Sequence, residues 1–267
     1  MSHKEIKCQS LLRHFTAPDK YFHGSYAMDV YQNCVFGCRY CDSSNDSMVY
    51  ICSNALELLG KEVKNILPGR VIIGSVHDPY QPVEESYSLV RRILVFLINK
   101  GFSVHVLTKS PLVLRDIDIL TKSQDNLVTI SMISLDPQLN HVFEPYVPAI
   151  QTRLMTVKKL VKQGIFSGVA LFPILPFLVD DELESIIKKC KDIDACYVVY
   201  KYLELKGQQK QDFFRLLKKE YPSLARKYKE LYGDRFSPNE KYITNLDQKL
   251  KQLCRFIDIS CGIPMTR

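Results

Sequence analysis

Apolar and polar positions along this chain follow two periods, one typical of strands and one typical of helices. Strand-like patterning with β-branched or aromatic residues appears at residues 26–32, 70–76, 102–108, 127–135, 168–172 and 196–202. Helix-like apolar periodicity lies between these segments, at residues 50–66, 84–99, 112–122, 151–163 and 181–191. Strands that alternate with helices form parallel sheets through right-handed crossovers, so the pattern predicts an α/β fold.

Six such units are enough to close most of a barrel. The order therefore predicts a partial (β/α)6 TIM-like barrel over residues 26–205, preceded by an N-terminal extension at residues 1–25. Helical patterns continue further along the chain and predict a C-terminal helical extension, a cap over residues 206–267. Ligands of such barrels bind at the carboxyl ends of the strands, so chemistry is expected there.

Three cysteines lie close together directly after the first predicted strand. Cys34, Cys38 and Cys41 form a C-x3-C-x2-C spacing on one short loop. A four-iron cluster is normally held by four thiolates, one per iron, so three ligands leave one iron with an open coordination position. Zinc is the alternative metal, but its structural sites take four ligands. The nearest candidates for a fourth zinc ligand are Cys52, His77 and His23.

The other cysteines are scattered at irregular spacings. They are Cys8, Cys52, Cys190, Cys196, Cys254 and Cys261. An odd total of nine, with no apolar signal peptide at the N-terminus, favours reduced thiols and predicts a cytoplasmic protein. We expect these six to be small buried hydrophobic residues. The alternative is an auxiliary metal site formed by Cys254 and Cys261 with Cys190 or Cys196.

Composition restricts the classes of partner. With 267 residues and 46% hydrophobic content, the chain can fill one sizeable core. Its net charge of +7 is compatible with a nucleic-acid partner without requiring one. The longest apolar run, residues 93–98, is far shorter than the ~20 residues that cross a bilayer, so we expect no membrane partner.

Unusual polar residues gather at the carboxyl ends of the predicted strands. They are Ser75, His77, Asp78 and Tyr80 after the second strand, Thr108 and Lys109 after the third, and Ser131 and Ser134 in the fourth. Each has an ordinary structural interpretation, such as a turn at Asp78-Pro79 or a helix cap at Ser110. Their shared position at one rim favours a functional site.

The cysteine loop, with Tyr40 just before its last cysteine, resembles the signature of the radical S-adenosylmethionine (SAM) enzymes. Within that superfamily, four segments resemble the spore photoproduct lyase-like, or DNA repair photolyase-like, group. They are residues 74–84, 108–116, 143–145 with Arg153-Leu154, and 172–176.

This resemblance implies a [4Fe-4S] cluster and SAM as cofactors, and an electron donor such as flavodoxin or ferredoxin. It also implies that SAM is cleaved reductively to a 5′-deoxyadenosyl radical, which abstracts hydrogen from a substrate. The sequence does not identify that substrate.

Position by position, the resemblance assigns the three loop cysteines to the cluster and places Tyr40 near the adenine. Gly74, Ser75 and Val76 occupy the place where the superfamily's backbone receives the methionine amino group, although the usual Gly-Gly-Glu motif is absent. Lys109 matches a lysine directed at the methionine carboxylate, a charge-assisted contact. Ser131 lies within reach of the ribose or carboxylate, while Arg153 either serves the carboxylate or pairs with Glu144.

The substrate side departs from the group's pattern. Spore photoproduct lyases use a cysteine at the end of the second strand to return hydrogen to a thymine radical, and Ser75 stands there in this chain. A serine O–H bond is too strong to donate that hydrogen readily, so photoproduct repair would need Tyr80 or another cysteine. Asp78 and His77 are the other candidates for catalytic contacts with substrate.

Three functional hypotheses remain. The first is a radical SAM enzyme with an unassigned substrate. The second is repair of a thymine photoproduct in DNA, which Ser75 disfavours. The third is a non-catalytic zinc or cluster module that binds nucleic acid through its basic surface, and metal content distinguishes it from the others.

Overall fold

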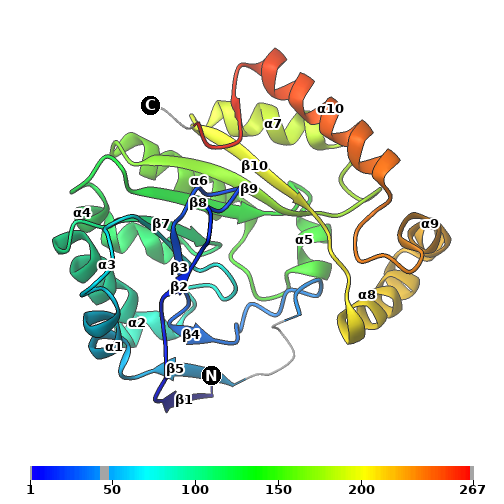
Figure 1. The fold of residues 1–267 in the computed structure, drawn as a ribbon. Helices are drawn as coiled ribbons and strands as arrows, with labels where there is room; N and C mark the ends of the chain where they lie inside the picture. Colours follow the sequence, from blue (N-terminus) through cyan, green and yellow to red (C-terminus); the bar gives the residue numbers. More distant parts are fainter. Residues whose placement is uncertain (1, 43–47, 265–267) are drawn as a thin grey trace.

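An eight-stranded sheet forms the centre of the molecule (Figure 1). The structure is a computed structural model and describes residues 2–42 and 48–264. The sheet contains β2 (Arg13–His14), β3 (Tyr26–Met28), β6 (Arg70–Ile73), β7 (Ser103–Thr108), β8 (Leu127–Met132), β9 (Phe166–Ile174), β10 (Tyr197–Tyr202) and β11 (Ser260–Cys261). Their order is β11-β10-β9-β8-β7-β6-β3-β2. The strands from β3 through β10 run parallel, which confirms the predicted partial (β/α)6 barrel.

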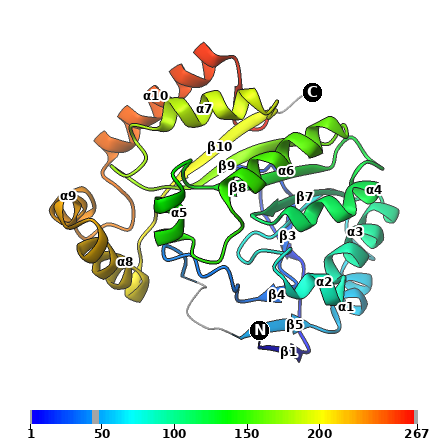
Figure 2. The same ribbon diagram turned by 180° about the vertical axis from the view of Figure 1, so that it is seen from behind.

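Helices connect successive strands and cover the outer face of the sheet (Figure 2). They are α1 (Ala55–Glu62), α2 (Val83–Tyr87), α3 (Leu89–Asn99), a 3-10 helix η1 (Pro111–Asp116), α4 (Ile117–Leu120), α5 (Pro137–Phe143), α6 (Ile150–Lys162) and α7 (Leu183–Asp192). The apolar spacing of each longer helix explains its placement. In α3, Val90, Ile93, Leu94 and Leu97 fall on one side and are fully buried, because residues three and four apart share a helix face.

A second apolar cluster lies on the opposite face of the sheet, inside the barrel. Ala27 and Ile72 are register partners there, and Ala170 belongs to the same cluster. Gly168 makes room for the buried ring of Tyr197, since a Cβ at Gly168 would lie 2.4 Å from that ring. Small residues on some strands therefore match large residues on their neighbours, which allows close packing inside the curved sheet.

The chain before β6 differs from the sequence prediction. The expected strand at residues 26–32 divides into β3 and β4 (Tyr31–Gln32), and β4 joins β1 (His3–Ile6) and β5 (Val49–Cys52) in a separate three-stranded sheet. The start of the expected helix at residues 50–66 is wrong because β5 occupies it. The run Val49–Cys52 is rich in strand-forming residues, and pairing on both edges outweighs the local helix pattern.

The C-terminal region carries α8 (Gly207–Glu220), α9 (Pro222–Tyr232) and α10 (Glu240–Ile257), which confirms the helical extension. The helices α8 and α9 follow the carboxyl end of β10, while α10 packs against α7 (Figure 1). After α10 the chain returns to the sheet as β11, so its last described part belongs to the barrel edge. Within residues 2–42 and 48–264, no helix combines the length and apolar character that crossing a membrane requires.

Candidate active site

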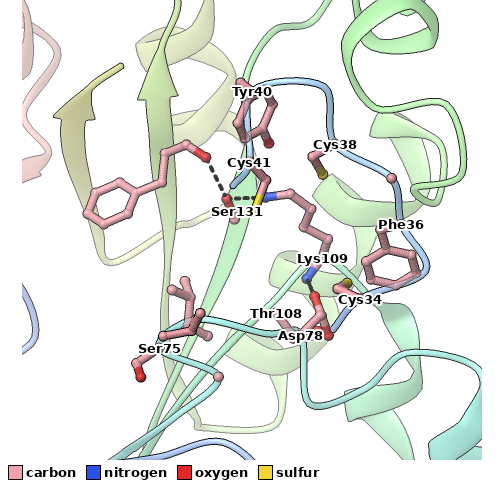
Figure 3. A pocket seen from close by; sticks show the side chains of 15 residues that line it. Cys34, Phe36, Cys38, Tyr40, Cys41, Ser75, Asp78, Thr108, Lys109 and Ser131 are labelled. Atoms are coloured by element: carbon pink, nitrogen blue, oxygen red, sulfur yellow. Dashed lines mark hydrogen bonds between the residues drawn. The ribbon is translucent and has the colours of Figure 1, made fainter. Parts of the chain in front are cut away.

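A cavity of about 200 Å³ opens at the carboxyl ends of the central strands. The cysteine loop forms one wall, and the chain after β6, β7 and β8 forms another (Figure 3). Most of the predicted site residues line this cavity, namely Cys34, Cys38, Cys41, Tyr40, Gly74, Ser75, Val76, Asp78, Lys109 and Ser131. Tertiary structure thus brings together residues that lie about a hundred positions apart in the chain.

The cysteine loop is held in a tight turn over the barrel. Gly37 has a φ of +61°, and a Cβ there would lie 2.9 Å from the Tyr146 ring, so the turn requires glycine. The Arg39 amide donates to the Phe143 carbonyl at 2.8 Å and ties the loop to the end of α5. Burial raises the pKa of the Cys34 thiol to about 12. A bound metal would have to displace that proton, since the thiolate is the metal ligand.

The loop does not have the ligand spacing of a single metal ion. Among the described His, Cys, Asp and Glu side chains, no three are grouped closely enough to hold one ion. A zinc site would place its ligands 2.0–2.3 Å from a common centre, as is typical of zinc in proteins. The candidates for a fourth zinc ligand lie elsewhere, because Cys52 contacts Asn54 and His23 contacts the Ile263 carbonyl. Three thiols spread around one cavity fit a cluster, in which each thiolate binds a separate iron.

Lys109 and Ser131 supply the polar groups on the opposite wall. The Lys109 ammonium group donates to the Ser131 hydroxyl at 2.7 Å, and it lies 3.6 Å from a Glu144 carboxylate oxygen. Ser131 donates in turn to the Phe172 carbonyl at 3.4 Å. Figure 3 shows the Lys109 side chain reaching Ser131 beside the cysteine loop. A cation and a hydroxyl on one wall are suited to a ligand carboxylate.

The chain after β6 is organised by Asp29, a residue that the sequence analysis missed. One Asp29 carboxylate oxygen accepts hydrogen bonds from the Val76 and His77 amides, both at 3.0 Å. The other oxygen accepts the Ser75 hydroxyl at 2.8 Å, and Arg13 donates to that hydroxyl at 3.2 Å. The Ser75 side chain is thus fully engaged at the edge of the cavity.

Gly74 leaves room for this turn. Its φ is +90°, and a Cβ there would lie 2.4 Å from the Leu107 carbonyl oxygen and 2.5 Å from Pro79. Only glycine meets both conditions, so the backbone of Gly74 borders the cavity directly.

Asp78 supports the loops and has few acceptor positions left for a ligand. Its Oδ1 accepts the Thr108 hydroxyl at 2.6 Å and the Tyr80 amide at 2.9 Å, while its Oδ2 accepts the Lys109 amide at 2.7 Å. Burial raises the pKa of Asp78, and these hydrogen bonds oppose that rise. The carboxylate therefore connects the ends of β6 and β7.

Two predicted substrate contacts do not reach the cavity. Tyr80 is fully buried and donates its hydroxyl to Asp116 at 2.8 Å. His77 is half-buried and lies outside the lining, and burial lowers its pKa. Neither side chain lines the cavity, and the turn after Asp78 directs the Tyr80 ring into the packing beneath η1, so their contact with a substrate stays a prediction.

Arg153 lies behind the cavity wall, where it is only 1% exposed. Its guanidinium lies 2.8 Å from Glu144 Oε2 and also donates to the Ser131 carbonyl and the Asn140 side chain, each at 3.0 Å. Of the two roles that the sequence left open, the structure confirms the pairing with Glu144. The hydroxyl of Tyr40 donates to the other oxygen of Glu144.

Comparison with known proteins identifies the family. The profile of the Radical SAM superfamily matches residues 28–190, more than half of the chain. This chain belongs to the Radical SAM superfamily. The family implies a [4Fe-4S] cluster and SAM, and the donors around the cavity fit both groups.

Relatives of this radical SAM protein occur in archaea, bacteria and viruses. An uncharacterized protein of Methanocaldococcus jannaschii is 30% identical over 216 residues, covering 77% of this chain and 80% of that protein. The Radical SAM Nalpha-GlyT isomerase of Pseudomonas phage M6 is 19% identical over 180 residues, covering 64% of this chain and 38% of the isomerase. Spore photoproduct lyase, solved in complex with dinucleoside spore photoproduct, superposes with a TM-score of 0.72 at 13% identity. That superposition covers 96% of this chain and 79% of the lyase, and it shows a common fold.

The remaining cysteines of this radical SAM protein form no disulfide bond in the described part of the chain, and they lie outside the cavity. Cys52, Cys190 and Cys254 are buried, as expected, whereas Cys8 and Cys196 are only half-buried. Cys261 is exposed and differs from the prediction. Because no three ligand-type side chains in the described part of the chain are grouped for a metal ion, the alternative of an auxiliary metal site has no support.

Proposed function

We propose that this protein is a radical SAM enzyme in which Cys34, Cys38 and Cys41 hold a [4Fe-4S] cluster and the adjoining cavity binds SAM. Once bound and reduced by a donor protein, the cluster and SAM would supply the radical chemistry typical of the family, reductive cleavage of SAM followed by hydrogen abstraction from a substrate. The observation that carries the proposal is that three thiols, the Lys109–Ser131 pair and the Gly74 backbone line one cavity.

Each wall of the cavity has a distinct binding role in this proposal. Lys109 and Ser131 bind the methionine carboxylate, since an ammonium and a hydroxyl give charge-assisted and neutral hydrogen bonds. The backbone at Gly74, which is free of side-chain bulk, receives the amino group. Asp29 and Asp78 hold these two walls in place through their hydrogen bonds to the turn backbone.

The proposal covers where the substrate enters and does not name its chemical class. A second cavity of about 250 Å³ shares Tyr40, Cys41 and Phe172 with the first, and we propose that the substrate enters there. The role that a cysteine plays in spore photoproduct lyase is not proposed for Ser75. Its hydroxyl is bonded to Asp29 and Arg13, and its O–H bond resists hydrogen-atom donation.

Anaerobic reconstitution with iron and sulfide tests this proposal. After reduction with dithionite, the wild-type protein should convert SAM to 5′-deoxyadenosine, measured by chromatography. Cys38→Ala should lose both iron and cleavage, whereas Cys190→Ala, a buried thiol in α7, should keep both. The proposal fails if the reduced, cluster-loaded protein leaves SAM intact. About one zinc per chain with no iron or sulfide would instead support a non-catalytic metal module.

A further inference from the structure

Glu144 is a buried carboxylate that side chains from three parts of the site approach. Its side chain is 0% exposed. The Tyr40 hydroxyl, from the cysteine loop, donates to Oε1. The Arg153 guanidinium, from α6, lies 2.8 Å from Oε2, and the Lys109 ammonium, after β7, lies 3.6 Å from Oε1.

These groups place two cations around one anion. Arg153 makes the closer contact and is itself buried, so Glu144 neutralises it first. Lys109 is farther away and hydrogen-bonds the neutral Ser131 hydroxyl at 2.7 Å. Within this group of three side chains one positive charge remains, on the one that lines the cavity. The other charged group beside Lys109 is Asp78, whose carboxylate already accepts three hydrogen bonds from the turns. In a poorly hydrated site such a surplus charge favours an anionic ligand group.

Arg153 and Lys109 also share a neighbour. Arg153 donates to the backbone carbonyl of Ser131, and Lys109 donates to the hydroxyl of the same residue. Without the charge of Glu144 the two cations would repel each other across Ser131. The long, flexible lysine would move more easily than the buried guanidinium.

We propose that Glu144 is a positioning residue for SAM. It neutralises Arg153 and holds Tyr40, so that Lys109 alone presents a positive charge to the methionine carboxylate. This inference rests on the proposed function, because it assigns Lys109 to that carboxylate. It adds a residue that contacts no ligand and acts only through Lys109 and the loop.

A double-mutant cycle on the reconstituted protein tests the proposal, with the dissociation constant of SAM measured by equilibrium dialysis. Glu144→Gln keeps the side-chain shape and an acceptor for Tyr40, and removes the charge. We expect it to weaken SAM binding about tenfold in the wild-type background and less than about twofold in a Lys109→Met background. Iron content should equal that of the parent in each case.

A charge-balanced variant provides a second, independent readout. Glu144→Gln combined with Arg153→Met removes both members of the buried pair and leaves Lys109 as the remaining cation of this group. It should recover most of the SAM affinity that Glu144→Gln loses, and it keeps the test decisive if Glu144→Gln alone does not fold. Thermal unfolding of the cluster-free proteins shows which variants are folded.

The outcomes separate this inference from the proposed function. If wild-type protein neither binds nor cleaves SAM, the proposed function is wrong. If wild-type protein cleaves SAM but Glu144→Gln binds it equally well or more tightly, the positioning role is overturned. Equal weakening in the wild-type and Lys109→Met backgrounds, or no recovery in the charge-balanced variant, also overturns it.

Discussion

The Lys109 ammonium group lies 2.7 Å from the Ser131 hydroxyl oxygen; Lys109 directly follows β7, and Ser131 lies in the neighbouring strand β8. Thr108 and Ile130 are register partners, and Lys109 and Ser131 are the next residues along the two chains, so both lie at the same rim of the barrel. The hydrogen bond directs a flexible lysine into the cavity. It also links the two side chains that are proposed to receive the carboxylate of SAM.

Replacement of that lysine should weaken SAM binding without loss of the cluster. A hydrogen bond to a charged group contributes roughly 1.5–3 kcal/mol, so Lys109→Met should raise the dissociation constant about ten- to a hundredfold. Iron analysis and equilibrium dialysis of the reconstituted protein measure the two effects separately. Lys188→Met, which removes an exposed lysine paired with Glu184 on α7, is the control. Simultaneous loss of iron and SAM would indicate a folding role for Lys109.

The buried Arg153 should contribute strongly to stability. Arg153→Met removes the close partner of the Glu144 carboxylate and leaves only Lys109, 3.6 Å away, as a cation beside it; breaking a buried pair typically costs about 3–5 kcal/mol. Urea unfolding of the cluster-free protein measures the change in the free energy of unfolding. Arg226→Met, which breaks an exposed pair with Glu230, should change it far less, because solvent screens an exposed pair. Equal effects of the two variants would contradict the structural role of the buried pair.

Alanine substitutions at Gly74 and Gly60 should have opposite effects on stability. Gly74→Ala forces a Cβ to 2.4 Å from the Leu107 carbonyl oxygen at a φ of +90°, which should destabilise the protein by more than about 1 kcal/mol. Gly60 lies within α1 and a Cβ there meets nothing within 4 Å, so Gly60→Ala should stabilise it by about 0.5–1 kcal/mol. Urea unfolding compares the two. Stabilisation by Gly74→Ala would contradict a tight turn at this position.

Cys261 should be unusually reactive at neutral pH. The hydrogen bond from the Cys254 thiol, with help from Tyr200 and Lys251, lowers the pKa of Cys261 from its ordinary value of 9.0 to about 7. Because a lowered pKa favours the thiolate, the alkylation rate should rise as the pH increases through about 7 and level off above it. Mass spectrometry after timed exposure to iodoacetamide follows this rate for each cysteine.

Removal of the donor provides the control for this titration. Cys254→Ala should shift the midpoint of Cys261 alkylation to higher pH, since the hydrogen bond to the thiolate is lost. A midpoint near 9.0, the ordinary pKa of this thiol, in the unmodified protein would contradict the prediction. Cys190 should react slowly at any pH near neutrality, because it is buried and burial raises its pKa to about 12.

Long segments with clear periodicity were predicted well. The expected helix at residues 151–163 is α6 within one residue at each end, and the expected strand at residues 102–108 is β7 without its first residue. Short elements were not predicted well. The strands β1 and β5 each have four residues, and they pair across more than forty intervening positions. No local pattern reports such long-range pairing, which depends on tertiary contacts.

The sequence by itself determined the barrel class and the cluster loop. Alternating periodicity and a C-x3-C-x2-C spacing are local properties, and each is visible within a few residues. Only the tertiary structure decided which rim residues share a cavity, because that depends on where each turn directs its side chains. The turn after β6 buries Tyr80 and fixes Ser75 on Asp29. The fold likewise places Glu144 between Tyr40, Arg153 and Lys109, since a buried carboxylate must find its partners from distant parts of the chain.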